Sequence, residues 1–238
     1  MAAIEERAGV KTLSVVVPAY NEERFIGTLL QRIGAVDLAP LGFQMEIIVV
    51  DDRSTDRTAE IAAGVPGVRL LRMEVNGGKG RAVRAGIAAA TGDLLIIQDA
   101  DLEYDPQDYL PMVRALLDGR AAIIYGSRYL RRGRHVNQTL GAYLGGRSLS
   151  LVAWLFTGAR LTDTVTAFKL FRREEVAALP LETNGFELDH ELTARMLARG
   201  KTIAEVPISY YPRSREEGKK IGPRDWFIAV RTLWKYRR

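Results

Sequence analysis

Two kinds of hydrophobic pattern alternate along the chain. Short runs rich in valine, isoleucine and leucine, typical of buried strands, are followed by segments in which apolar residues recur every three or four positions, as on one face of a helix. The strand patterns lie at residues 13–18, 45–51, 68–73, 93–98, 121–125, 164–171 and 202–211. The helix patterns follow Asn21 and Ser54, begin at about Lys79 and at Pro106, cover residues 147–156 and 186–199, and resume from Pro223. This alternation predicts an α/β fold with a mostly parallel central sheet flanked by helices.

Polar residues mark several of the expected helix starts. Asn21, Ser54 and Asp105 each stand just before a helix pattern, and Pro106 follows the last of them. Such side chains commonly accept hydrogen bonds from the first backbone amides of a helix, and proline suits the first turn. We therefore expect these three residues to cap helices.

The length and composition suit one large domain. The chain has 238 residues, 47% of them hydrophobic, which is enough for a substantial core. We expect a single domain, residues 1–238, in which residues 11–127 bind a nucleotide and residues 128–238 shape the site for the other substrate. The absence of cysteine excludes disulfides, zinc-thiolate sites and cysteine nucleophiles, and only two histidines, His135 and His190, argue against a histidine-rich metal site.

No segment of the sequence has the character of a membrane span or a signal peptide. The longest apolar runs, such as residues 151–156, are far shorter than the roughly 20 residues that cross a bilayer. Residues 1–11 carry charges of both signs and lack an apolar core. These features predict a cytoplasmic location.

The net charge of +5 is unevenly distributed. Basic residues gather in three places: Arg128, Arg131, Arg132 and Arg134; Arg213, Arg215, Lys219, Lys220 and Arg224; and Lys235, Arg237 and Arg238. The last group is what a solvated surface would show, whereas the two inner groups favour anionic phosphates or an acidic membrane surface. We expect no nucleic-acid partner, because no recognised binding motif accompanies the charge.

One strand pattern ends in closely spaced acidic residues. The apolar run at 93–97 leads into Asp99, Asp101 and Glu103. In an extended segment alternate side chains share a face, so these carboxylates would converge on one hard cation. Ligand sites in open α/β sheets lie just beyond the carboxyl ends of strands, where this segment falls. The segment therefore predicts a site for a divalent cation and a nucleotide diphosphate.

Two further strand patterns end in residues suited to a nucleoside. The first contains Pro18 and is followed by Tyr20, whose ring could stack on a base, and by Glu22, which could accept from a base or ribose. A helix cap beside a packed ring explains the same residues equally well. The second pattern ends at Asp51 and Asp52, and an acid at that place suits recognition of a base or ribose.

A glycine-rich segment, residues 76–80, precedes one of the helix patterns. Its backbone amides and Lys79 could approach the nucleotide. The spacing is not that of a P-loop, and neither Ser nor Thr follows the lysine. A turn that uses glycine for a positive φ is an equally good interpretation.

These segments together resemble the family 2 inverting glycosyltransferases of GT-A fold. The matching motifs are VPAYNE (17–22), VDDRSTD (50–56), NGGKG (76–80) and QDADLEYDP (98–106). Within that family, YGSR (125–128), LTD (161–163), YPR (211–213) and EGKKI (217–221) are most similar to the dolichyl- or polyprenyl-phosphate mannose synthase branch. The resemblance extends from about residue 13 to residue 237 and implies a Rossmann-like GT-A fold.

The resemblance also implies an activity and a role for each matching residue. A hexose, mannose or glucose, would pass from a GDP- or UDP-sugar to a polyprenyl or dolichyl phosphate. Pro18, Tyr20, Glu22, Asp52, Lys79, Asp99, Ala100 and Asp101 would bind the nucleotide sugar, and Asp99, Asp101 and Glu103 would hold Mg²⁺ or Mn²⁺. Arg128, Arg147, Ser148, Arg213 and Lys219 would surround the phosphates, with Asp101, Arg128 and Arg213 acting in catalysis.

Three alternatives stay open. A family 2 enzyme that glycosylates a hydroxyl group, on a glycan or a protein, would need a general base, for which Asp189 and Glu191 are the candidates, although Glu191 also suits the polar face of an ordinary helix. A sugar-1-phosphate nucleotidyltransferase would be expected to carry a glycine-rich loop after the first strand. A subunit that only binds nucleotide would be expected to lack the acidic pair.

A lipid acceptor would require access to a membrane. We expect either a membrane partner subunit or an amphipathic docking surface, which would place the protein on the cytosolic membrane face. Residues 149–156 with Trp154, together with Trp226, Phe227 and Trp234, lie near basic residues and are candidates for that surface. Packing of these aromatic residues in a core is the more ordinary interpretation.

Overall fold

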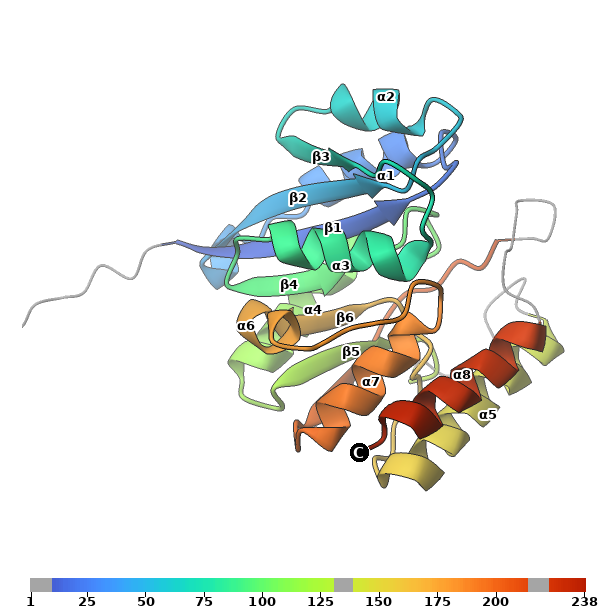
Figure 1. The fold of residues 1–238 in the computed structure, drawn as a ribbon. Coiled ribbons are helices and arrows are strands. Elements are labelled where there is room, and N and C mark those ends of the chain that lie inside the picture. Colours follow the sequence, from blue (N-terminus) through green and yellow to red (C-terminus); the bar gives the residue numbers. More distant parts are fainter. Residues whose placement is uncertain (1–9, 131–138, 214–222) are drawn as a thin grey trace, which may run out of the picture.

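A seven-stranded sheet forms the centre of the molecule (Figure 1). The computed structural model describes residues 10–130, 139–213 and 223–238. The strands, in the spatial order β3-β2-β1-β4-β6-β5-β7, are β1 (Lys11–Ala19), β2 (Phe43–Asp51), β3 (Val68–Arg72), β4 (Leu94–Ile97), β5 (Ile123–Ser127), β6 (Lys169–Arg172) and β7 (Ile203–Pro207). All seven expected strands are therefore present.

Eight α-helices and two short 3-10 helices are found among the described residues. The α-helices are α1 (Ile26–Gly34), α2 (Thr58–Ala63), α3 (Lys79–Ala89), α4 (Tyr109–Leu117), α5 (Leu140–Thr157), α6 (Arg173–Ala177), α7 (Leu188–Ala198) and α8 (Pro223–Tyr236). The 3-10 helices are η1 (Ala39–Leu41) and η2 (Pro106–Asp108). None of the described helices is long and apolar enough to cross a membrane.

The sheet is mostly parallel, as predicted. β1 pairs in parallel with β2 and β4, β2 with β3, and β5 with β7, whereas β6 runs antiparallel to both of its neighbours. The carboxyl ends of β1, β2 and β4 consequently meet at one edge of the sheet. The segments that carry the nucleotide and acidic motifs all leave the sheet at that edge.

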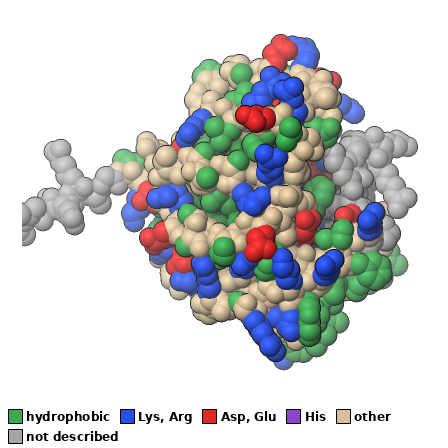
Figure 2. Space-filling view, in the orientation of Figure 1, with side chains coloured by type: hydrophobic (Ala, Val, Ile, Leu, Met, Phe, Trp, Pro, Cys, Tyr) green, Lys and Arg blue, Asp and Glu red, His purple; other side chains and the backbone are tan. Residues whose placement is uncertain are grey.

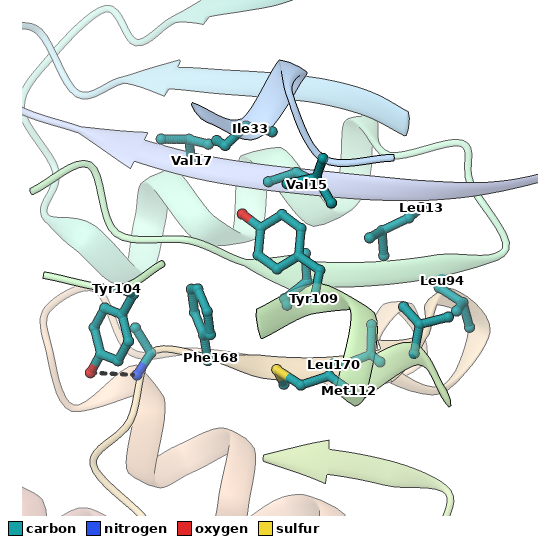
Figure 3. Packing of buried hydrophobic residues seen from close by; sticks show 14 of the residues in the cluster. Leu13, Val15, Val17, Ile33, Leu94, Tyr104, Tyr109, Met112, Phe168 and Leu170 are labelled. Carbon is teal, nitrogen blue, oxygen red and sulfur yellow. Dashed lines mark hydrogen bonds between the residues drawn. The ribbon is translucent and has the colours of Figure 1, made fainter. Parts of the chain in front are cut away.

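The two faces of the sheet bury separate sets of apolar side chains. On one face Val15 and Val17 pack with α1 and α4, and Figure 3 shows Tyr109, Met112 and Phe168 in the same cluster. On the other face Val16 packs with residues of α3 and α7. Alternate side chains of β1 therefore contribute to both cores. A β-carbon at Gly86 of α3 would collide with Val16, so glycine at this position allows the helix to lie close to the strand.

Helices α5 and α8 pack against each other beside the sheet (Figure 1). Ala153 of α5 and Leu233 and Tyr236 of α8 form a small cluster with Ala194 of α7. The apolar contacts of this cluster pack the pair against α7.

Helix starts and strand lengths differ from expectation in several places. Asn21 and Ser54 do not cap α1 or α2, which begin at Ile26 and Thr58. Instead they join two loops, because the Asn21 amide donates to Ser54 Oγ at 3.0 Å and the Thr55 amide donates to Asn21 Oδ1 at 2.9 Å. Asp105 does cap η2 by accepting from the Gln107 amide. β6 and β7 are shorter than predicted, and α5 begins seven residues earlier, at residue 140 rather than 147.

Candidate active site

The acidic segment follows β4 as a turn, so the prediction that it is extended is wrong. The chain turns at residues 100–103, and Leu102 has a φ of 61°. The Glu103 amide donates to Asp101 Oδ1 at 3.2 Å, which fixes these two residues relative to each other. The three carboxylates still lie close enough to interact: after burial, the charges of Asp99 and Glu103 raise the pKa of Asp101, and Arg213 reaches both Asp101 and Glu103. Proximity therefore comes from the turn and not from strand alternation.

Each of these carboxylates has a close partner. Lys79 Nζ lies 2.8 Å from Asp99 Oδ1, and Arg213 Nη2 lies 3.0 Å from Asp101 Oδ2. The Arg213 amide donates to Glu103 Oε1 at 2.8 Å, and the Tyr210 hydroxyl donates to Glu103 Oε2 at 2.9 Å. The segment after β7 is thus fastened to the segment after β4.

The chemistry of these residues suits a divalent cation. Burial, followed by the charges of Asp99 and Glu103, raises the pKa of Asp101 to about 7, which indicates an excess of negative charge that a cation would relieve. Carboxylate oxygens are the ligands that Mg²⁺ and Mn²⁺ prefer. Among the residues that the structure describes, no three acidic or histidine side chains form a ready-made metal cluster, which agrees with their engagement by Lys79 and Arg213.

A chain of alternating charges leads from the acidic segment into the core. Lys79 bridges Asp99 and Asp189, and Asp189 Oδ1 lies 2.8 Å from Nζ of Lys169, which is fully buried in β6. Burial alone would raise the pKa of Asp189, but the charges of Lys169 and Lys79 lower it to about 2. Asp189 is therefore a firmly ionised partner of two lysines.

Glu191, the other candidate base, is also engaged. Its carboxylate is fully buried and accepts from the amides of Glu182 and Thr183, from the Thr183 hydroxyl at 2.6 Å and from Arg195 Nε at 2.7 Å. These bonds hold the loop that precedes α7. Glu191 lies on a helix as expected, but it is buried rather than on a polar face, and its contacts are those of a structural residue.

That loop lies against the glycine-rich segment. The Gly80 amide donates to the Asn184 carbonyl at 2.6 Å, and a β-carbon at Gly78 would collide with the same carbonyl. Gly78 has a φ of 89°, so the interpretation as a glycine turn is confirmed there. The Gly77 and Gly78 amides donate to Asp52 at 2.8 and 2.7 Å, so these amides do not form an open phosphate cradle.

The predicted nucleoside residues lie at the same sheet edge. Pro18 is buried within β1, and Tyr20 just beyond it is 37% exposed. Glu22 Oε2 lies 3.1 Å from Arg213 Nη1, so Arg213 joins this residue to Asp101. Asp52 is buried and braces the glycine turn.

Arg128 and Asp163 form a buried ion pair. Two parallel contacts of 2.7 Å join the guanidinium to the carboxylate, and the Arg128 amide also donates to Asp163. Glu205 accepts from the amides of Thr162 and Asp163 and so fixes their loop. The Arg128 guanidinium also lies 5.1 Å from the centre of the Tyr210 ring, next to Glu103.

The Tyr129 ring connects Arg128 to α5. The guanidinium groups of Arg128 and Arg147 lie 5.5 and 5.4 Å from its centre. Arg147, exposed on α5, donates to the Thr162 carbonyl at 2.9 Å. The next residue, Ser148, accepts from Trp226 Nε1 at 2.9 Å, which ties α8 to α5. A continuous set of contacts thus runs from the acidic segment to the helix pair.

Several residues of this network were not predicted from the sequence. Its predicted residues come together in the arrangement described, except Lys219, which lies outside the described residues. Lys169, Asp163 and Glu205 were not assigned roles. A lysine between Phe168 and Leu170 in an apolar strand was a visible signal, because a buried charge requires a partner.

Comparison with known proteins identifies the family. The model of glycosyl transferase family 2 matches residues 14–177. The chain belongs to glycosyl transferase family 2. It is 32% identical over 217 residues to a dolichol-phosphate mannosyltransferase of Pyrococcus furiosus, covering 88% of this chain but only 59% of that enzyme. It is 33% identical over 204 residues to a dolichyl-phosphate hexose transferase of Haloferax volcanii, covering 86% of this chain and 85% of that protein.

Solved structures of a glycosyltransferase from another organism share the fold. A glucosyl-3-phosphoglycerate synthase of Mycobacterium tuberculosis, crystallised with Mn²⁺, UDP and phosphoglyceric acid, superposes with a TM-score of 0.73. The match covers 95% of this chain and 78% of that one at 24% sequence identity. The predicted GT-A fold is thereby confirmed.

Proposed function

We propose that this family 2 protein transfers a hexose, mannose or glucose, from a GDP- or UDP-sugar to a polyprenyl or dolichyl phosphate. The dolichol-phosphate and dolichyl-phosphate names of two relatives support the acceptor, and the UDP complex of a structural neighbour supports a nucleotide-sugar donor. One domain, residues 1–238, would do this work in the cytoplasm, with residues 11–127 on the donor side and 128–238 on the acceptor side.

The observation that carries the choice of acceptor is the engagement of both candidate bases. Asp189 is paired with Lys79 and Lys169, and Glu191 is buried under its hydrogen bonds. A hydroxyl acceptor must lose its proton to a base, whereas a phosphate acceptor is already an anion at neutral pH. The arrangement therefore favours a phosphate over a glycan or protein hydroxyl.

On the donor side, Asp99, Asp101 and Glu103 would hold Mg²⁺ or Mn²⁺, which when bound would stabilise the charge of the nucleoside diphosphate leaving group. Tyr20 would contact the base, and Asp52 would shape the adjoining turn. Lys79 and Arg213, now on the carboxylates, are placed to turn towards the diphosphate oxygens when donor and cation enter.

On the acceptor side, Arg147 is an exposed cation that shares the Tyr129 ring with the buried Arg128. Arg128 is held by Asp163, so we assign it mainly to orienting Tyr129 and Tyr210 and to supplying positive charge. Arg147 and Ser148 would then bind the lipid phosphate, which attacks the anomeric carbon of the sugar as the bond to the diphosphate breaks. The configuration at that carbon would be inverted.

The experiment is a turnover panel of GDP- and UDP-hexoses with Mg²⁺ or Mn²⁺, with and without a short-chain polyprenyl phosphate. Nucleoside diphosphate and glycolipid are measured together. We expect release of nucleoside diphosphate with one donor only when the lipid is present, with an equal amount of glycolipid. Release that ignores the lipid, or transfer to a sugar hydroxyl, would contradict the proposal.

A further inference from the structure

Helix α5 exposes a row of leucine side chains to solvent. Leu140, Leu144, Leu151 and Leu155 follow one another along one face and are between 52 and 67% exposed. The opposite face, with Leu149, Ser150 and Ala153, is buried. A surface helix normally shows the reverse arrangement. Arg147, in the middle of the exposed face, is the only charged residue of the whole helix.

Helix α8 continues this surface with a different composition. Its exposed positions are Arg224, Phe227, Ile228, Arg231, Trp234, Lys235 and, just beyond the helix, Arg238. Basic and large apolar residues thus alternate on one face, and its one acidic residue, Asp225, is half-buried. We call the exposed residues of α5 and α8 together the helix-pair surface. Figure 2 shows hydrophobic side chains gathered at this end of the molecule.

The two helices are held as one unit. They pack against each other, the Phe156 and Trp234 rings lie 5.3 Å apart edge to face, and Trp226 donates to Ser148. The exposed leucines and the basic aromatic face therefore belong to one rigid surface. A contiguous exposed apolar patch of this kind marks a binding surface.

We propose that the helix-pair surface docks on an anionic lipid bilayer. Exposed arginine and lysine among tryptophan, phenylalanine and leucine match the acidic headgroups and the adjoining acyl region, which is the composition of helices that lie in a membrane interface. The described side chains of α5 and α8 include one acidic group, the half-buried Asp225, so the charge of this surface suits an anionic partner.

Docking explains the place of Arg147. It lies in the exposed face between Leu144 and Leu151 and points its guanidinium to Thr162 and Tyr129, at the edge of the candidate active site. With the leucines at the acyl boundary, this cation lies at headgroup depth. The inference rests on the proposed function for the identity of the lipid phosphate delivered there, but docking itself needs neither donor nor acceptor.

The test is co-sedimentation of the full chain with phosphatidylcholine vesicles that contain 30% phosphatidylglycerol, compared with pure phosphatidylcholine, without nucleotide sugar or polyprenyl phosphate. We expect binding to the anionic vesicles that weakens as salt is raised. The Leu151→Ser, Leu155→Ser double variant should lose at least about tenfold in partitioning, and Arg231→Gln about fivefold. Matched controls are Leu117→Ser, at a leucine 46% exposed on α4, and Arg32→Gln on α1, which should bind as the wild type does.

Two outcomes would overturn docking. One is no binding of the wild type to anionic vesicles, or the same loss in test and control variants. The other is concentration-dependent self-association by light scattering that the double leucine variant abolishes, which would assign the surface to a second copy of the chain. Because the assay contains no substrate, vesicle binding without lipid-dependent turnover would leave docking intact and overturn the proposed function alone.

Discussion

The sheet around β1 and the α5/α8 helix pair use apolar side chains in opposite ways. Val15 and Leu29 are fully buried between the sheet and α1, whereas Leu155 and Phe227 of the helix pair are 67 and 69% exposed. Burying apolar surface stabilises a fold by about 25 cal/mol per Å². Folding alone therefore accounts for the apolar residues near β1. The exposed ones of the helix pair contribute little to folding, which is why we assign them to the proposed docking on a bilayer.

The charged residues show the same contrast. Near β4 acidic and basic groups are paired and partly buried, as Asp101 and Arg213 are, whereas the helix pair exposes basic groups alone. Paired buried charges are typical of a site that binds a compact, charged ligand, and exposed cations are typical of a surface that meets an extended anionic one. The predictions below ask whether the two regions really differ in this way.

The largest effect is expected at the acidic segment. Asp101→Ala should lower turnover at least about a thousandfold, or about 4 kcal/mol in activation free energy, because the diphosphate would lose its cation site. The melting temperature should not fall, since the variant removes a buried carboxylate with a raised pKa. Asp105→Ala is the matched control: it removes the η2 cap and should lower the free energy of unfolding by about 1 kcal/mol with turnover nearly unchanged. Unchanged turnover in Asp101→Ala would contradict the assigned site.

A pair of leucine substitutions compares the two regions directly. Leu29→Ala, in the core, should lower the free energy of unfolding by about 2–5 kcal/mol, as cavity-forming substitutions do. Leu155→Ala should change it by less than about 0.5 kcal/mol, as most surface substitutions do. Urea denaturation measures both. A similar loss in the two variants would mean that α5 belongs to the core.

Acid should lower the free energy of unfolding through the buried His190 of α7. Burial lowers the pKa of His190 to about 4, so the folded state keeps it neutral where the unfolded chain, with a pKa near 6.5, is protonated. The resulting stabilisation is complete above pH 6.5 and is lost as the pH falls towards 4. Its magnitude is up to about 3 kcal/mol. The difference in free energy of unfolding between wild type and His190→Gln should therefore shrink over that range, and a pH-independent difference would contradict the account.

The smallest effect is expected at Arg147. With a water-soluble short-chain acceptor, Arg147→Ala should lower turnover about tenfold to thirtyfold, which corresponds to about 1.5–2 kcal/mol for a charged hydrogen bond. Binding of the nucleotide sugar should not change. Arg160→Ala is the control, since Arg160 is also exposed but stacks on Trp154 away from Tyr129. Equal losses in the two variants would remove the reason to place the acceptor phosphate at Arg147.

The sequence predicted the fold closely because hydrophobic periodicity reports burial. All seven strands and the mostly parallel sheet followed from it. Boundaries were less accurate where loop contacts decided them. Asn21 and Ser54 have good capping side chains, yet they bond to each other's loops because Asn21 takes a φ of 55° and the helices start later. At these two residues the hydrogen bonds between distant loops replaced the helix caps that the local sequence favours.

The members of the site were predicted better than their contacts. The acidic motif fell at the end of β4 as expected, but its geometry comes from a turn at Leu102 that periodicity does not reveal. Pairings such as Arg128 with Asp163, or Lys79 with Asp189, join residues 35 and 110 positions apart. A single sequence does not encode such partners in any local pattern, so these pairs emerged only from the fold.

The most direct test of the central claim uses two acceptors with the same short polyprenyl chain, one ending in a phosphate and the other in a hydroxyl. Each is incubated with the donor that the panel selects, and the glycolipid is quantified. Because Asp189 and Glu191 are held by other groups, we predict transfer to the phosphate and none to the alcohol. Transfer to the alcohol at a comparable rate would show that a base operates in this site and would contradict the account.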